Sequence, residues 1–378
     1  MRIALAASSY LPRLGGVEEH VFHLSAELRR RGHEVSVWTV DQGDAAEAGV
    51  RTLPCPLPNR SVGGLLRWAA ALPRAAAAWR RAIRADRPDL IVIQCFGANG
   101  PWAAATARRH GIPLVYANHG ETFMDAHDAF ATSALLRRTL GETLRDARAV
   151  TSCSAYAGAD LDRFGEHSPV TVVGNGIDTE AGAEPLGVVL PGRYIAGVGR
   201  LVDNKGFDIL LRAFARAETA LNGLQLVIAG DGPERPALAE LARELGIAAR
   251  VTFTGALQRG QVRTLLDGAT AHVIPSRVEA FGIVVLEGWR SGTPVIVTDR
   301  GGPPEFVTDG VDGLLFDPES PGRLAELLTR VAHDDGLRAR LGAAGARAVG
   351  GFSWGHVADR YERVLEDAVI DTGSRSRP

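Results

Sequence analysis

Short apolar runs alternate with helical segments along nearly the whole chain, and this alternation restricts the fold more than any other feature. In the first half, the runs predicted as strands cover residues 2–7, 34–40, 89–94, 113–117 and 149–152. In the second half they cover residues 194–198, 224–229, 251–253, 271–274, 294–297 and 313–316. Strands that alternate with helices form parallel, doubly wound sheets. The sequence therefore predicts an α/β protein with two such sheets.

A break between the two series predicts a domain boundary. The chain has 378 residues, which exceeds the size at which one hydrophobic core keeps growing, so two domains with a cleft between them are expected. Residues 178–192 are rich in Gly, Ala, Pro and Glu and lack periodicity, and we interpret them as a linker. The predicted domains, both Rossmann-like, are residues 1–177 and 193–353.

Composition argues against several classes of function. A net charge of -2 gives no reason to expect nucleic acid as a partner. Cys55, Cys95 and Cys153 are far apart and lack metal-ligand spacing, so we expect reduced thiols and no metal site. No apolar run reaches the length of a membrane span, and the run at the N-terminus is too short for a signal peptide. We therefore expect a soluble protein of the cytoplasm.

One segment is strongly basic. Residues 60–88 contain a single acid, Asp86, and two tryptophans among seven arginines. A basic amphipathic surface of this kind can rest on anionic lipid, so peripheral contact with the inner face of a membrane is one interpretation. A solvated helical face is the other. The arginines are Arg60, Arg67, Arg74, Arg80, Arg81, Arg84 and Arg87.

A strand, a tight loop and a helix start follow one another over residues 271–287. Free amide groups at this helix start would point out of the carboxyl edge of the sheet, where the helix dipole favours an anion. Glu279 and Glu287 flank that position, and because carboxylates repel phosphate we interpret them as acceptors for sugar or ribose hydroxyls. The alternative is an ordinary strand-helix unit with two solvated glutamates. The amides concerned belong to Phe281, Gly282, Ile283 and Val284.

The only lysine in the chain, Lys205, lies just beyond the first strand of the second half. The other 41 of the 42 basic residues are arginine, which suggests that this position needs a compact ammonium group. Gly199 has no side chain, so it leaves room beside the backbone at this strand end. Arg200 and Lys205 can then converge on the same anion position as the helix start. Two cations and a helix N-terminus would neutralise a diphosphate. The alternative is an arginine and a lysine on a surface loop.

Three motifs of the second half occur in order: Gly199-Arg200-(x4)-Lys205-Gly206, Gly230-Asp231-Gly232-Pro233 and Pro275-Ser276-(x2)-Glu279-(x)-Phe281-Gly282-(x4)-Glu287. Further motifs are Gly15-Gly16-Val17-Glu18, His119-Gly120, Asn175-Gly176-Ile177-Asp178 and Phe352-Ser353-Trp354. Together these motifs, which span nearly the whole chain, closely resemble the GT4 family of retaining glycosyltransferases, which have the GT-B fold. The resemblance also implies that the last helix, residues 354–370, packs on the first domain, which would bind the acceptor.

The resemblance implies a role for each matching residue. Arg200 and Lys205 would hold the diphosphate of the donor, and Lys205 would partly neutralise the leaving group. Glu279 would accept hydrogen bonds from the donor sugar and Glu287 from the ribose. His119 would reach the sugar from the other domain, although a structural histidine is the alternative. The other implied donor-binding positions are Gly15 and Gly16, for which a simple turn before a helix is the alternative, and Gly199, Leu257, Phe281, Gly282, Ile283 and Val284.

The resemblance also implies a mechanism, namely a front-face substitution in which the departing diphosphate draws the proton from the incoming hydroxyl. No metal or other cofactor would be needed. The donor would be a UDP-, GDP- or ADP-hexose, and the acceptor hydroxyl would belong to a glycan, a lipid-linked sugar or a small molecule. A GT-B nucleotide-sugar epimerase or phosphorylase, and a non-catalytic nucleotide-sugar-binding protein, are the alternatives. A nicotinamide-dependent dehydrogenase fits poorly because Gly15-Gly16 lacks the further glycine of the dinucleotide fingerprint.

Overall fold

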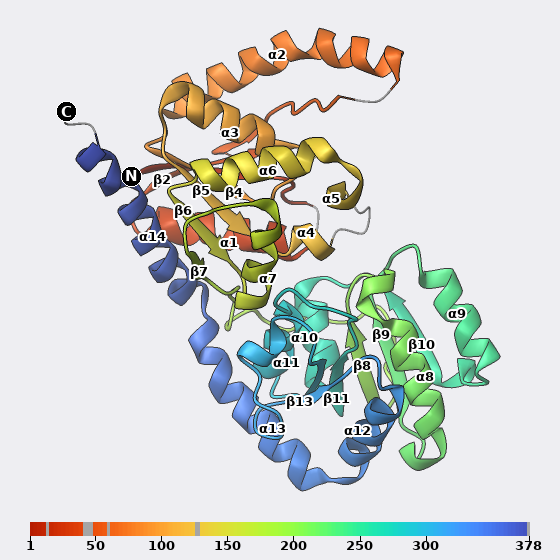
Figure 1. Ribbon diagram of the computed structural model, residues 1–378. Helices are drawn as coiled ribbons and strands as arrows, with labels where there is room; N and C mark the ends of the chain where they lie inside the picture. Colours follow the sequence, from red (N-terminus) through yellow and green to blue (C-terminus); the bar gives the residue numbers. More distant parts are fainter. Residues whose placement is uncertain (13–14, 41–47, 59–60, 125–128, 376–378) are drawn as a thin grey trace. The chain divides into compact units, whose positions relative to one another are not determined.

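The computed structural model describes residues 1–12, 15–40, 48–58, 61–124 and 129–375. These residues form two compact units (Figure 1). The first unit comprises Met1–Asn175 and Trp354–Pro378, and the second comprises Gly176–Ser353. Each unit contains one parallel sheet with helices on both faces, so the predicted pair of doubly wound sheets is confirmed. The cleft between two domains stays a prediction.

The sheet of the first unit has seven parallel strands in the order β3-β2-β1-β4-β5-β6-β7. Its five inner strands are largely buried apolar runs, which is why the sequence reveals them. The two edge strands were not predicted, because each has only three residues, most of them exposed, and no apolar run. The strands are β1 (Arg2–Ala7), β2 (Glu34–Thr39), β3 (Val50–Thr52), β4 (Leu90–Gln94), β5 (Leu114–Asn118), β6 (Ala149–Ser152) and β7 (Val170–Val172).

Successive side chains of this sheet enter two different cores, as the two-residue period of a strand requires. On β1, Ile3 and Leu5 pack with helices α1 and α14, whereas Ala4 and Ala6 pack with α2, α3 and α6. The last helix thus belongs to the first unit. The helices of this unit are α1 (Gly16–Arg30), α2 (Val62–Asp86), α3 (Asn99–His110), α4 (Glu121–Met124), α5 (Ala129–Thr132), α6 (Ala134–Asp146), α7 (Ala155–Ala159) and α14 (Trp354–Arg375).

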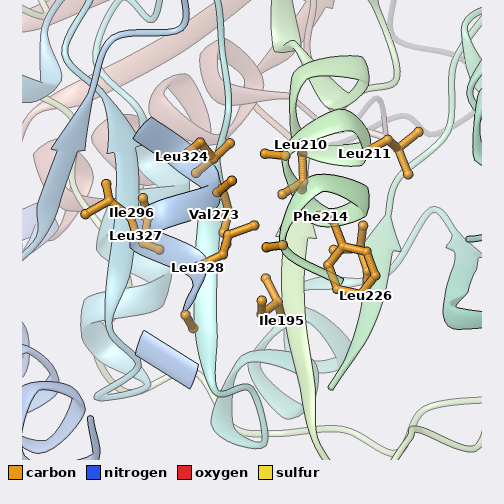
Figure 2. Close-up of a cluster of buried hydrophobic side chains, with 14 of the residues drawn as sticks. Ile195, Leu210, Leu211, Phe214, Leu226, Val273, Ile296, Leu324, Leu327 and Leu328 are labelled. Carbon is orange, nitrogen blue, oxygen red and sulfur yellow. The ribbon is translucent and has the colours of Figure 1, made fainter. Parts of the chain in front are cut away.

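The sheet of the second unit has six parallel strands in the order β10-β9-β8-β11-β12-β13. Every one of them matches a predicted run. Leucine and phenylalanine side chains of α8 and α12 cover one face and form the cluster in Figure 2. The strands are β8 (Tyr194–Val198), β9 (Gln225–Ala229), β10 (Val251–Gly255), β11 (Ala271–Ile274), β12 (Val295–Thr298) and β13 (Leu314–Phe316). The helices are α8 (Phe207–Ala217), α9 (Arg235–Glu244), α10 (Arg259–Asp267), α11 (Ile283–Arg290), α12 (Pro321–His333) and α13 (Asp335–Ala348).

Residues 178–192, interpreted from the sequence as a linker, are packed inside the second unit. The amide of Glu184 donates to the carbonyl of Gly260 at 2.9 Å, and Leu186 and Leu190 pack on the core that lies under α10. The segment lacks periodicity because its backbone is irregular, not because it is free. The chain instead leaves the first unit after Asn175 and re-enters it at Trp354.

Helix α2 carries most of the strongly basic segment. Its buried face includes Ala75, Trp79 and Ala82, and the indole of Trp79 donates to the carbonyl of Pro54 at 3.1 Å. The arginines of the segment that the structure describes are all exposed, and Arg60 lies outside the described residues. Among the helices described, none is both long enough and apolar enough to cross a membrane.

Candidate active site

The candidate site lies at the carboxyl edge of the second sheet, between β8 and β11. These strands are neighbours, but the strands that follow each of them in sequence lie on opposite sides of the pair. The strand order therefore reverses between β8 and β11, and open α/β sheets bind ligands outside the carboxyl ends of their strands at such a point. The motifs around Lys205 and Glu279 occupy these two loops.

A glycine brings the two loops into direct contact. Gly206 has φ 64°, in the left-handed region, and a Cβ atom at this position would lie 2.1 Å from the carbonyl oxygen of Pro275. Only glycine fits such a position without strain. The amide of Arg277 also donates to the carbonyl of Asn204 at 2.9 Å. The backbone thus fixes the distance between the lysine and glutamate motifs.

Lys205 and Glu279 form an ion pair across this contact. The ammonium Nζ lies 2.6 Å from Glu279 Oε2, and Ser276 Oγ donates to the same oxygen at 3.0 Å. The Glu279 side chain is 7% exposed and that of Lys205 is 20% exposed, so the pair is largely withdrawn from water. Both bonds end on Oε2, and within the described residues Oε1 has no hydrogen-bond donor. The sequence predicted both residues as parts of one site but not their direct contact.

A second ion pair, which was not predicted from the sequence, supports the lysine loop. Arg277 donates to the two carboxylate oxygens of Asp208 at 2.8 and 2.9 Å and to the carbonyl of Asp203 at 3.1 Å. Although burial acts to raise the pKa of Asp208, the bonds from Arg277 hold this pKa below its usual value. The two residues lie close to the lysine and glutamate motifs in the sequence, but nothing in that spacing pairs them.

The start of α11 lies beside the ion pair. Its N-cap is Gly282, with φ 95°, and the helix begins at Ile283. The first amides of a helix have no partner within it, so they are available to an anion. The Phe281 side chain is buried and stacks on Phe306 with 4.7 Å between ring centroids, so Phe281 can offer a ligand only its backbone.

Glu287 lies about one turn into α11, within the electrostatic reach of two arginines. Burial raises the pKa of Glu287 to about 6, although Arg290 and Arg259 act to lower it. The Nη1 atom of Arg290 donates to the carbonyl of Asp178 at 2.9 Å, which fixes this side chain against the first residues of the second unit. The sequence pointed to the glutamate but to neither arginine, because a lone arginine in this chain carries no signal.

Other predicted donor-binding residues are placed less directly. Arg200 is exposed and takes part in no ion pair among the residues that the structure describes, so its convergence with Lys205 stays a prediction. Leu257 packs partly on the core under α10. The Gly230-Asp231-Gly232-Pro233 motif lies in the loop between β9 and α9, which begins at Arg235.

Gly15, Gly16 and His119 belong to the first unit. Gly15 is the N-cap of α1 with φ -178°, an extended conformation open to any residue, and Gly16 is the first helical residue. His119 follows β5 at the carboxyl edge of the first sheet, and its Nε2 lies 2.7 Å from Oε1 of Gln94. Burial, together with His20, holds the pKa of His119 well below its usual value. The contact of these residues with a donor stays a prediction.

No group of three or more metal-ligating side chains that could hold an ion occurs among the described residues. The loops at the candidate site offer instead an ammonium group, a carboxylate and a helix start, which suit an anion with hydroxyl groups on either side of it.

Two family models match consecutive parts of the chain. Residues 14–181 match the model described as Glycosyltransferase Family 4, and residues 182–348 match the model described as Glycosyl transferases group 1. The chain is 30% identical over 393 residues to the glycogen synthase of Mycobacterium tuberculosis, covering 96% of this chain and 94% of that protein. It is 29% identical over 390 residues to the D-inositol 3-phosphate glycosyltransferase of Corynebacterium diphtheriae, covering 94% and 90% respectively.

Solved structures share the fold over nearly the full length. The crystal structure of Anabaena Alr3699/HepE in complex with UDP-glucose has a TM-score of 0.75 at 21% identity and covers 96% of this chain and 99% of that one. Sucrose-phosphate synthase from Thermosynechococcus elongatus has a TM-score of 0.79 at 22% identity and covers 98% and 99%.

Proposed function

Because this chain belongs to the glycosyltransferases of family 4 and group 1, we propose that it moves a hexose-type sugar from a nucleoside-diphosphate sugar to an acceptor hydroxyl. Configuration at the sugar is retained and no metal takes part. The observation that carries the proposal is the Lys205–Glu279 ion pair at the start of α11, where a cation for phosphate and an acceptor for sugar hydroxyls lie 2.6 Å apart. The complexes of HepE with UDP and UDP-glucose make uridine donors the first to test.

In this reaction the bond between the anomeric carbon and the diphosphate oxygen breaks while a bond from the acceptor oxygen forms on the same face. The acceptor proton passes to the departing phosphate oxygen. Lys205, Arg200 and the first amides of α11 stabilise the charge that develops there, and such preorganised stabilisation usually lowers the barrier more than any other catalytic effect. Glu279 Oε1 accepts from a sugar hydroxyl and Glu287 accepts from the ribose.

The test begins with a thermal-shift screen of UDP-, GDP- and ADP-sugars. A ligand at a hundred times its Kd adds about 2.7 kcal/mol to stability. The donor that shifts the melting temperature is then incubated with glycan, lipid-linked and small-molecule acceptors, with and without EDTA, and the anomeric configuration of the product is determined by NMR. We expect retention, full activity in EDTA and no turnover by K205M. An inverted product, loss of activity in EDTA or epimerised donor would contradict the proposal.

We also propose that α2 rests on the surface of an anionic membrane. Near its start Val62, Leu65 and Leu66 are 77, 43 and 69% exposed, and its exposed arginines take part in no ion pair among the described residues. The single acid in the sequence from 60 to 88, Asp86, is paired with Arg51 and with the indole of Trp38. Exposed apolar side chains beside unneutralised arginines match the interfacial boundary of anionic lipid.

Cosedimentation with vesicles tests this contact. The protein should pellet with phosphatidylcholine vesicles that contain phosphatidylserine and not with phosphatidylcholine alone. Leu66→Asp and the double variant Arg80→Glu/Arg84→Glu should each abolish pelleting, whereas Arg243→Glu on α9, also an exposed helical arginine, should not. Equal pelleting of all variants would refute a role for α2.

A further inference from the structure

A buried polar cluster lies next to His119 in the first unit, and the proposed function does not use it. Gln94, the last residue of β4, is fully buried, and its Oε1 atom lies 2.7 Å from Nε2 of His119. A carbonyl oxygen can only accept, so Nε2 carries the proton of this imidazole. The Nε2 atom of Gln94 is buried and has no hydrogen-bond partner among the described residues, and the ring of Tyr361 on α14 lies 5.3 Å from that of the nearby His20.

His20 of α1 supports the ring from another direction. The two imidazoles meet edge to face, with centroids 4.7 Å apart at an angle of 69°. His20 is fully buried, its Nδ1 lies 2.8 Å from Oδ1 of Asn175, and its ring lies 5.5 Å from that of Trp354. Asn175 and Trp354 are the residues at which the chain leaves and re-enters the first unit. His20, which packs on His119, is therefore held by the residues at both of these points.

Both imidazoles are neutral at physiological pH. Burial lowers the pKa of His20 to about 4, and burial and the neighbouring His20 hold the pKa of His119 well below its usual value. A neutral imidazole has one N–H and one bare nitrogen. With Nε2 protonated toward Gln94, the nitrogen of His119 without a proton is Nδ1. This atom has no hydrogen-bond partner among the described residues, and it is not one of the side-chain atoms that are buried without a partner.

We propose that Gln94 is a positioning residue for His119, because its carbonyl oxygen holds the imidazole in the Nε2–H tautomer and leaves Nδ1 to accept a hydrogen bond from a substrate hydroxyl. The backbone of His119 is fixed independently, since its amide donates to Oε2 of Glu121 at 2.8 Å. The choice of tautomer matters because the Nδ1–H tautomer would present an N–H group, which cannot accept a hydrogen bond from a hydroxyl. The part played by the substrate rests on the proposed function, whereas the tautomer does not.

Nitrogen-detected NMR of the histidine rings in the full chain tests the proposal. The protein is labelled with ¹⁵N-histidine, and His119 is assigned by its absence in His119→Asn. We expect a protonated Nε2 and a bare Nδ1 in the wild type, a mixture of tautomers in Gln94→Met, and the wild-type pattern in Gln94→Glu, which keeps an acceptor oxygen. In Gln94→Met, kcat should fall by about tenfold or more with little change in KM, because the ring is misplaced and not removed.

Thr151→Val is the matched control. Thr151 is buried in the same cluster, 3.5 Å from the Tyr361 hydroxyl, but does not contact His119, so its replacement should leave the His119 resonances unchanged. A protonated Nδ1 in the wild type, or His119 resonances and kcat that do not change in a folded Gln94→Met, would overturn the proposal. If Gln94→Met does not fold, the wild-type and Gln94→Glu spectra still decide it. Absence of any transferase activity would refute the proposed function and leave the tautomer result standing.

Discussion

Removing the ammonium group of Lys205 should destabilise the second unit measurably. In K205M the Glu279 carboxylate, which is 7% exposed, keeps only the hydroxyl of Ser276 as a partner. Breaking a buried pair from one side costs about 3–5 kcal/mol, whereas an exposed pair contributes about 0.2–1 kcal/mol. The lysine side chain is 20% exposed, so this pair lies between those limits. We expect a loss of about 2 kcal/mol of unfolding free energy.

The complete double-mutant cycle isolates the interaction. In E279Q the freed ammonium is nearer to solvent and the amide oxygen still accepts, so the loss should be about 1 kcal/mol. The double variant K205M/E279Q leaves no charge behind and should also lose about 1 kcal/mol, which gives a coupling energy of about 2 kcal/mol between the two side chains.

Calorimetry of the four proteins measures this coupling. For a unit of this size, 1 kcal/mol corresponds to about 2–4 °C, so K205M should lower the melting temperature of the second unit by about 4–8 °C. Arg200→Met removes an exposed cation from the same loop and serves as the control, with a change of about 1 °C or less. If the losses in K205M and E279Q are simply additive, the two side chains are not coupled and the geometry of the site is wrong.

Three further predictions concern the candidate site and the packing of each unit. Gly206→Ala should lower the unfolding free energy of the second unit by about 3 kcal/mol or more, because a Cβ atom would meet a backbone oxygen at 2.1 Å. Gly223 also has a positive φ but has open space around it. Gly223→Ala should therefore cost about 1 kcal/mol in the same calorimetric assay. Burial raises the pKa of the Glu287 carboxyl to about 6, so this group gains a proton as the pH falls through 6. The affinity for a nucleoside diphosphate, measured by titration calorimetry, should therefore weaken from pH 7 to pH 5 more in the wild type than in Glu287→Gln. Identical pH profiles of the two proteins would exclude contact between Glu287 and the ribose. Arg31→Ala should destabilise the first unit by about 2 kcal/mol, because this largely buried guanidinium connects the end of α1 to two carboxylates of α14. Arg30→Ala, which removes an exposed ion pair, is the control and should cost at most about 0.5 kcal/mol. Urea denaturation measures both losses.

Much of the fold was predictable because its signals are local. A buried strand such as β4 is an unbroken apolar run, and each helix that covers a sheet repeats its apolar residues with the helical period. The short edge strands β3 and β7 gave no such signal, because an edge strand is held by backbone hydrogen bonds that any sequence can make. The packed segment at 178–192 was misread for a similar reason, since irregular backbone and flexible backbone have the same composition.

The sequence alone determined two doubly wound sheets, because these depend on periodicity. It also predicted a site in the loops that follow β8 and β11, with Lys205, Glu279 and Glu287, from residue type at the ends of strands. Only the tertiary structure decided which side chains meet. Lys205 and Glu279 lie 74 residues apart and touch because Gly206 lets one loop rest on the next strand end. Gln94 and His119 meet because β4 and β5 are neighbours. Such contacts are set by strand order and by the steric limits of the backbone, which no local pattern records.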